Sequence, residues 1–416
     1  MHPFTILFLV FLTAMALTRL WLSLRQQRHI LAHRDAVPEA FADRIPLADH
    51  QKAADYSIAK LKLGRISLGW EVLWLLLWTL GGGIEAIDQF WRSLQLGPMT
   101  TGIGVILSIT LMMSLLDLPF SLYSTFVIEE RFGFNKMTFG LWLTDLLKTA
   151  VLMIVIGVPL IAAILWLMNR AGEWWWLYAW GVWGAFTLLM IWAYPTFIAP
   201  LFNRFEPLKD EALRQRIESL LQRAGFKSQG VFVIDGSKRS AHGNAYFTGF
   251  GDNKRIVFYD TLLDSLSEDE IEAVLAHELG HFKRKHIRKS LILSLLTALI
   301  GFALLAWLMQ QPWFYTALGV STPSTHVALV LFMLVLPVFT FFLSPLFAML
   351  SRKHEFEADE FASQQANARA LISALVNLYR ENASTLTPDP VHSAFYDSHP
   401  PASIRINHLQ RLAHAR

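Results

Sequence analysis

The segment 267–286 reads SEDEIEAVLAHELGHFKRKH and predicts a helix with a sharply defined start. Ser267 with Glu270 has the Ser-x-x-Glu form of a capping box, so we expect a helix that begins there and runs through 277–286. His277 and His281 are four residues apart on this helix and project from one face, which suits two corners of a tetrahedral Zn²⁺ site. Glu278 lies roughly a quarter-turn aside, where it can take a proton from zinc-bound water. The alternative is a surface helix that carries these side chains by chance, and a third ligand decides between the two.

Two classes of third ligand can be checked in the sequence. Metzincins place Gly three and His six residues after the second His, where this chain has Arg284 and Ile287, so that class is excluded. His286 lies off the ligand face of a continuous helix, and we expect it to be a solvated neighbour of Lys283 and Lys285. A carboxylate further along the chain is therefore the remaining choice.

The acidic residues that follow are confined to one short stretch. Residues 287–354 contain no Asp or Glu, and the first candidates after them are Glu355, Glu357, Asp359 and Glu360. They lie on a predicted helix that continues out of the last apolar segment, from Ser351 to about Tyr379. Glu355 and Asp359 share one face of it, whereas Glu357 lies nearly opposite. We therefore assign Glu355 to the metal and Asp359 to orienting a ligand His, the usual division of such a pair. An acidic solvated face is the alternative.

The composition indicates a membrane protein. Of the 416 residues, 54% are hydrophobic and only 17% are charged, with a mean hydropathy of +0.38, whereas soluble domains carry about 25% charged residues. The formal net charge of +3, without a basic run or a base-reading motif, excludes nucleic acid as a partner. The absence of cysteine excludes disulfides, thiolate zinc sites and a Cys nucleophile.

Seven apolar stretches are long enough to cross a bilayer, which requires about 20 residues. They lie near 3–24, 66–83, 102–121, 146–168, 174–196, 290–310 and 325–350. The first has no basic region before it and is too long for a signal peptide, so we expect an anchor that is retained. Lys and Arg are dense between the first two spans, in 197–289 and in the C-terminal tail, and there is no charge in 311–324. This alternation predicts an N-terminus outside, with the zinc site and the C-terminus in the cytosol.

The polar pieces combine helical and strand patterns. Residues 206–225 have helical periodicity, while Val231–Ile234, Asn244–Phe250 and Arg255–Tyr259 are short β-rich runs. The predicted fold is a membrane all-α bundle of seven transmembrane helices with a cytosolic α+β zinc-protease domain of gluzincin type. We divide the chain into four regions. Residues 1–196 hold the first five spans, and 197–289 form a cytosolic zinc-protease region. Residues 290–350 hold spans six and seven, and 351–416 form a C-terminal region that supplies the third ligand and the substrate-binding residues.

The chain resembles the type I CAAX prenyl proteases, which are seven-span zinc endopeptidases. The resemblance rests first on His277–His281 together with the segment 355–359, EFEAD. It extends to 125–135 after the third span, to 237–247 and 255–263, and to His399-Pro400-Pro401 followed by Arg405. Order and spacing are preserved over nearly the whole chain.

The resemblance implies one Zn²⁺ on His277, His281 and Glu355, with Glu278 as the general base. It also implies that His399 and Arg405 contact the substrate carbonyl or backbone near the metal, where such donors stabilise a developing oxyanion. The alternative for His399 is a helix-start residue before Pro400 and Pro401.

Asn244, Ala245 and Tyr246 would, by the same resemblance, pair main chain to main chain with an extended peptide. An ordinary internal strand would show the same sequence pattern. The expected substrates are CAAX-type peptides, prenylated at the C-terminus, or membrane peptides and proteins. The compact chain, without a long hydrophilic insertion between spans six and seven, favours a bacterial member in the inner membrane.

Two other functions can be weighed against a protease. A transporter or channel with a structural metal would need charged residues along its path, but the spans are poor in charge apart from Glu71, Asp117 and Asp145. A protease-like scaffold that binds clients without cutting them is disfavoured because the predicted base, Glu278, is present.

Overall fold

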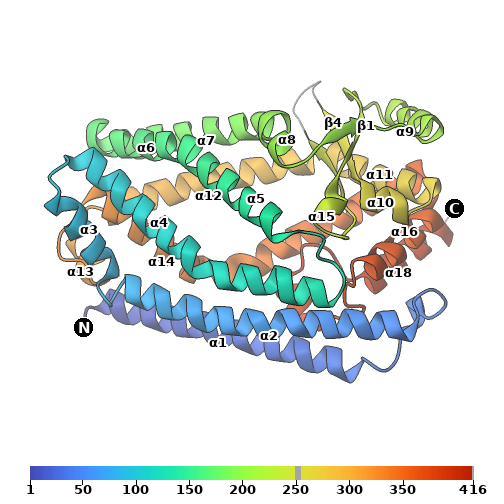
Figure 1. Ribbon diagram of the computed structural model, residues 1–416, viewed down its shortest axis with the longest axis horizontal. Coiled ribbons are helices and arrows are strands. Elements are labelled where there is room, and N and C mark those ends of the chain that lie inside the picture. Colours follow the sequence, from blue (N-terminus) through green and yellow to red (C-terminus); the bar gives the residue numbers. More distant parts are fainter. Residues whose placement is uncertain (249–253, 415–416) are drawn as a thin grey trace.

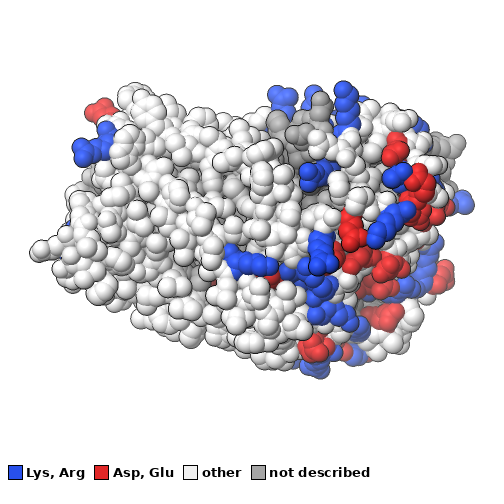
Figure 2. Space-filling model, turned by 45° about the horizontal axis from the view of Figure 1, so that its top comes forward, with Lys and Arg blue, Asp and Glu red and all other residues white. Residues whose placement is uncertain are grey.

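The computed structural model describes residues 1–248 and 254–414, so the end of the predicted run Asn244–Phe250 lies outside the described residues. Long helices run along the molecule, and a small sheet with its own helices lies at one end, near the C-terminus (Figure 1). Figure 2 shows charged side chains gathered over one end of the visible face, while the remainder is nearly free of them. This distribution is that of a protein whose apolar part lies in lipid.

Six helices or helix runs among the described residues are long and apolar enough to span a membrane. They are α1 (Pro3–Ala32) and the runs Pro98–Glu129, Phe139–Arg170, Gly172–Phe202, His286–Leu308 and Thr325–Gln365. A seventh is obtained if α2 (Leu47–Trp78) and α3 (Gly83–Ser93), which meet at an angle of 49°, form one span. The seven predicted spans all fall on these segments, and the mostly helical membrane fold is confirmed.

Several spans are built from more than one helix. The helices of the spans that follow α3 are α4 (Pro98–Tyr123), α5 (Phe139–Leu152), α6 (Val158–Arg170), α7 (Trp175–Ala193), α8 (Ala199–Phe202), α12 (His286–Leu308), α14 (Thr325–Thr340) and α15 (Ser344–Gln365). The short α13 (Pro312–Thr316) lies between two spans. Wider π-helical turns join α5 to α6 and α7 to α8, and a tighter 3₁₀ turn joins α14 to α15. Such changes of pitch redirect a helix without exposing its backbone groups.

The sheet has four strands in the order β1-β2-β4-β3. These are β1 (Phe205–Pro207), β2 (Val231–Ile234), β3 (Ala245–Thr248) and β4 (Arg255–Tyr259). β2 and β4 are parallel, and the outer strands run antiparallel to their neighbours. The three predicted β-rich runs are therefore confirmed, apart from Asn244, over their described residues. β1 was not predicted, since Glu206 and Pro207 begin the stretch 206–225 that we assigned to a helix.

Six further helices belong to the polar pieces of the chain. They are α9 (Glu211–Arg223), α10 (Asp260–Ser265), α11 (Glu268–Lys283), α16 (Ala368–Glu381), α17 (Pro390–Tyr396) and α18 (Ala402–His414). Among them, α17 packs against α15 and α1. One apolar cluster joins α9, α11, the sheet and the C-terminal helices, from Leu213 through Leu279 to Phe361 and Leu409. The two polar pieces of the chain thus form one body with a shared core.

The predicted capping box is present, because Ser267 and Glu270 exchange side-chain and backbone hydrogen bonds at the start of α11. Two predicted helices were too long. The first ends at Lys283, and Lys285 adopts φ 60°, so that α12 begins separately at His286. The helix expected to reach Tyr379 ends at Gln365, and Asn367 caps α16. Each break depends on backbone turns that neither Gly nor Pro marks in the sequence.

α11 and α15 cross at Gly280 and Ala358. A Cβ added to Gly280 would lie 2.8 Å from Ala358 Cα and 2.9 Å from its carbonyl oxygen, closer than real Cβ atoms approach. Gly280 therefore permits a backbone contact that no other residue would allow at this distance. Because the predicted metal ligands lie on these two helices, this contact sets the distance between them.

We expect Gly280→Ala to push the two helices apart and to destabilise the protein by about 1–3 kcal/mol, the usual cost of overpacking a tight interface. Thermal unfolding of the detergent-solubilised protein measures this loss. Gly301→Ala in α12 is the matched control, since its Cβ would meet only Phe332 at 4.0 Å. Equal melting temperatures for the two variants would contradict the close crossing.

Candidate active site

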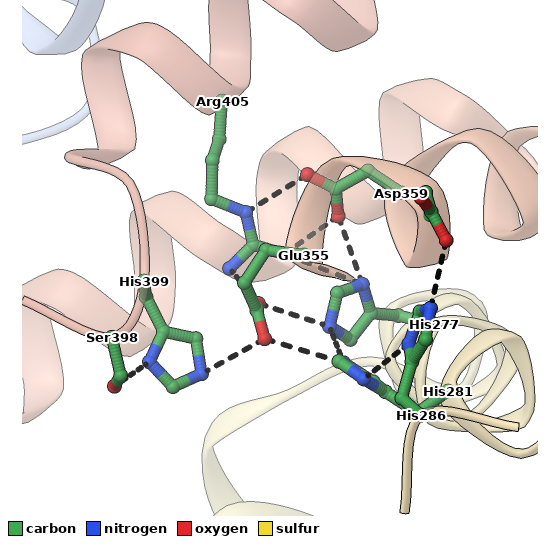
Figure 3. A network of polar contacts seen from close by, with 9 residues as sticks. His277, His281, His286, Glu355, Asp359, Ser398, His399 and Arg405 are labelled. Atoms are coloured by element: carbon green, nitrogen blue, oxygen red, sulfur yellow. Dashed lines mark hydrogen bonds and ion pairs between the residues drawn. The ribbon is translucent and has the colours of Figure 1, made fainter. Parts of the chain in front are cut away.

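Four of the predicted site residues meet where α11 crosses α15 (Figure 3). His277 and His281 come from α11, and Glu355 and Asp359 come from α15, so that each helix presents two residues one turn apart. His277, Glu355 and Asp359 are buried, and His281 is partly exposed. The predicted third ligand therefore lies beside the histidine pair, and the solvated acidic face is not what the fold forms at these positions.

The spacing of the ligand atoms of His277, His281 and Glu355 fits a zinc ion. His277 Nε2 and His281 Nε2 are 3.2 Å apart, and the two oxygens of Glu355 lie 3.4 Å and 3.3 Å from them. Ligands that bind zinc at about 2.0–2.1 Å from tetrahedral corners are themselves separated by about 3.3–3.4 Å. His277, His281 and Glu355 also form a group whose ligand atoms all lie within 4.8 Å of one another. The donor set and its spacing fit the ion.

The electrostatics of the group favour a cation. Glu355 Oε2 is buried and has no hydrogen-bond partner among the described residues, a state that is costly for a carboxylate oxygen unless a cation faces it. Burial lowers the pKa of His277, but hydrogen bonds with Asp359 and Glu355 outweigh it and raise this pKa to about 9. The surroundings of His277 thus stabilise positive charge.

Asp359 is fully buried and lies behind His277. Its Oδ1 is 2.8 Å from His277 Nδ1, and Arg405 donates to both of its oxygens at 2.6 Å and 2.9 Å. Arg405 Nη1 also lies 3.5 Å from Glu355 Oε2. The guanidinium, 6% exposed, faces these two carboxylates rather than open space, so the structure places Arg405 behind the ligands.

His286 was expected to be solvated, and this expectation was wrong. It is 3% exposed, its Nδ1 lies 3.1 Å from His281 Nδ1, and its Nε2 lies 2.9 Å from Glu357. The left-handed turn at Lys285 carries His286 back toward α11, whereas a continuous helix would have carried it away. His286 and Glu357 are thus site residues that the sequence analysis missed, and a single backbone turn hid them.

His399 contacts Glu355, and Glu278 directly follows His277 on α11. His399 Nε2 is 3.4 Å from Glu355 Oε1, its side chain is 60% exposed, and Ser398 Oγ lies 2.9 Å from its Nδ1 (Figure 3). Glu278 is partly exposed and has no hydrogen bond or ion pair within the described residues. Both side chains are therefore available to a substrate.

The predicted substrate strand lies at an edge of the sheet. Tyr259 N–H donates to the carbonyl of Asn244 at 2.9 Å. Because bonded pairs alternate along an antiparallel ladder, Tyr246 directs its backbone groups toward β4, and Ala245 directs its own toward the free edge. The side-chain oxygen of Asn244 accepts from Ala245 N–H at 2.8 Å. Among the described strands, none pairs with this edge of β3.

Comparison with known proteins agrees with this arrangement. The family described as CAAX prenyl protease N-terminal, five membrane helices, matches residues 26–204, and Peptidase family M48 matches residues 207–413. The chain is 34% identical to a CAAX prenyl protease 1 homolog of Oryza sativa, over 98% of this chain and 97% of the relative. It is 39% identical to CAAX prenyl protease 1 of Saccharomyces cerevisiae, over 72% and 70%.

The fold has been seen in a solved structure. The crystal structure of Ste24p from S. mikatae superimposes with a TM-score of 0.92 and 32% identity, over 98% of this chain and 99% of that one. The agreement extends through both the helical and the zinc-site halves of the chain. The chain therefore belongs to the CAAX prenyl protease 1 homologues of peptidase family M48 and is an integral-membrane metalloprotease.

Proposed function

We propose that the chain hydrolyses peptide bonds with one Zn²⁺ held by His277, His281 and Glu355, and with Glu278 as the general base. The observation that supports the proposal is the close grouping of the two imidazole nitrogens and the Glu355 carboxylate, whose separations of 3.2–3.4 Å are those between ligands of a tetrahedral zinc ion. A zinc ion bound there supplies a Lewis acid that polarises a carbonyl and lowers the pKa of water. Glu278 directly follows His277 on α11 and has no hydrogen bond or ion pair within the described residues, so in this proposal its carboxylate takes the proton of the attacking water and passes it to the leaving amine.

Asp359 and Arg405 act as positioning residues in this proposal. Asp359 accepts a hydrogen bond from Nδ1–H of His277, so the Nε2 of this ring is left unprotonated for the ion. Arg405 holds both oxygens of Asp359 and neutralises a charge that would otherwise be buried without a partner. The substrate contact that the resemblance implied for Arg405 stays a prediction.

His281 is held by a second chain of contacts. His281 Nδ1–H donates to His286 Nδ1, and His286 Nε2–H donates to Glu357, which leaves His281 Nε2 free for the ion. The two ligand histidines are thus oriented from opposite sides, one by Asp359 and the other by His286.

His399 is the residue that we propose to contact the substrate carbonyl. Its ring is exposed, and Nε2 lies next to Glu355. From there Nε2–H can donate a hydrogen bond to the carbonyl oxygen, which gains negative charge as water attacks. Ser398 fixes the ring through Nδ1, which leaves the proton on Nε2 when the hydroxyl is the donor. A hydrogen bond of this kind contributes about 3 kcal/mol to such a transition state.

The substrate lies along β3 in an extended conformation. Ala245 supplies the outward backbone groups, and Asn244 and Tyr246 flank it at the free edge of the sheet. The curated relatives are named as CAAX prenyl proteases, so we propose peptides prenylated near the C-terminus, or membrane peptides and proteins, as substrates. The lipid bilayer is the other partner, and nucleic acid is not one.

The orientation follows from charge and packing. Both polar pieces share one core and contribute to one site, and the dense Lys and Arg of 25–65 lie at the same end of the first two spans. We propose that this end is cytosolic, with the N-terminus outside. The four-part division of the chain and its location in a bacterial inner membrane stay predictions.

Two of the three acidic residues named for the spans, Asp145 and Glu71, are paired with arginine, which favours a structural use over transport. Asp145 is bound by Arg239 at 2.7 Å and 3.0 Å, and Glu71 is bound by Arg19 at 2.7 Å. These pairs fix helices to one another, which is a structural use of an intramembrane charge.

Glu278→Ala is expected to keep zinc and to lose peptide cleavage by a factor of about 10²–10⁴, because it removes the base and none of the ligands. Zinc per chain and cleavage of a farnesylated CAAX peptide are measured on the purified protein. Glu272→Ala, on the same helix but bound to Arg216 and Arg223 at the surface, is the control. Unchanged cleavage by the Glu278 variant would overturn the proposed mechanism.

His286→Phe is expected to weaken zinc binding by about 10–100-fold, since it keeps a ring in place but removes the acceptor for His281. Competition with a chelator of known affinity measures this loss without relying on activity. Glu360→Gln is the control, because Glu360 is on the exposed side of α15 and pairs only with Arg284. If zinc affinity is the same in both variants, His286 does not position His281.

The orientation can be tested with single cysteines, since the native chain has none. Ser93, at the end of α3, and Ser219, on α9, are both exposed and lie at opposite ends of the molecule. In intact cells, a membrane-impermeant maleimide is expected to label Ser93→Cys and to label Ser219→Cys only after the membrane is opened. Labelling in the reverse order would mean that the zinc site faces outward.

A further inference from the structure

A cavity of about 870 Å³ lies between the first two spans and the sheet. Arg19 of α1 and Lys60 and Arg65 of α2 line it, opposite Asn244 and Tyr259. No Asp or Glu is among the described residues that line it. A volume of this size is typical of a ligand pocket, and its charged lining is of one sign.

Two of these cations have no carboxylate partner. Arg65 donates to Ser23 at 3.0 Å and to Gln27 at 2.6 Å, which are both neutral, and it forms no ion pair within the described residues. Lys60 lies over the ring of Tyr56, with its Nζ 3.4 Å from the hydroxyl, and is likewise without an ion pair in the described part of the chain. Both charges therefore remain available to an anion.

The nearest carboxylate to Lys60 is already engaged. Glu129 accepts from Tyr56 at 2.5 Å and lies 3.3 Å from His242, and it is not part of the cavity wall. Arg19 differs from the other two cations, since it is paired with Glu71. The positive field in the cavity thus comes mainly from Lys60 and Arg65.

The cavity continues toward the site. It shares Gln26, Ser384, Thr385 and Tyr396 with a second hollow, and that hollow is lined by His399. Its wall also includes Asn244, which begins the free edge of β3. A peptide that lies along this edge and passes His399 can therefore place one of its ends in the cavity.

We propose that this cavity binds the C-terminal carboxylate of the peptide substrate, with Arg65 and Lys60 as its ligands. The inference rests on the proposed function, since a substrate cut near its C-terminus brings a free carboxylate close to the reacting bond. A carboxylate gains charge-assisted hydrogen bonds from both cations without displacing an existing ion pair. An anionic lipid headgroup is the competing ligand, but the shared walls with β3 and with the His399 hollow favour the peptide.

Two farnesylated CAAX peptides that differ only at the C-terminus, one with a carboxylate and one with an amide, test the proposal on the zinc-loaded protein in neutral detergent. We expect wild type to prefer the carboxylate peptide by about tenfold or more in kcat/KM, as charged hydrogen bonds of this kind imply. Arg65→Gln and Lys60→Gln are each expected to reduce that preference at unchanged zinc content. Lys62→Gln, exposed on the same helix and outside the cavity, should retain it.

Each other outcome counts against the proposal. Equal cleavage of the two peptides by wild type would overturn it and leave the proposed function intact, whereas cleavage of neither would overturn both. If Arg65→Gln lowers both rates by the same factor, and only when phosphatidylglycerol is added, the cavity holds a lipid headgroup instead.

Arg65→Lys keeps the charge and should retain most of the preference, which separates loss of charge from a folding defect.

Discussion

The close crossing of α11 and α15 is the contact on which the whole site depends. Gly280 lies between the two ligand histidines, and Ala358 lies between Glu355 and Asp359, so the smallest residues occupy the point of contact. Each imidazole Nε2 lies 3.3–3.4 Å from one oxygen of Glu355, and these distances require the helix axes to be held at one separation. The sequence spacing of each pair is a property of one helix, but the site exists only because the two helices touch.

Buried charge is the second constraint, and the C-terminal helix meets it. Glu355 and Asp359 place two carboxylates in a region that water does not reach, which is costly unless cations accompany them. Arg405 on α18 supplies one permanent cation, held by both oxygens of Asp359. The proposed zinc ion on His277, His281 and Glu355 would supply the other. An arginine far along the chain thereby keeps Asp359 ionised and aimed at His277, which explains why α18 packs against α15 and α16.

Features that depend on local sequence could be predicted, and features that depend on a turn or on distant contacts could not. The capping box at Ser267, the histidine pair and the β-rich runs follow from spacing along one element, and the structure has each of them. His286 was misplaced because a continuous helix was assumed across Lys285, whose left-handed backbone is not marked by glycine. The ion pair between Arg405 and Asp359 was not predicted, because the two residues are 46 positions apart in the sequence. No local pattern encodes such a pair.

The last two membrane spans are directly connected to the residues of the site. α12 begins at His286, whose ring contacts His281, and α15 leaves the last span and carries Glu355, Glu357 and Asp359. Any movement of the last two spans therefore moves the groups that orient both ligand histidines. The first two spans form the wall opposite Asn244 across the cavity. If the cavity binds the end of the peptide as proposed, the first two spans serve substrate binding as well as anchoring.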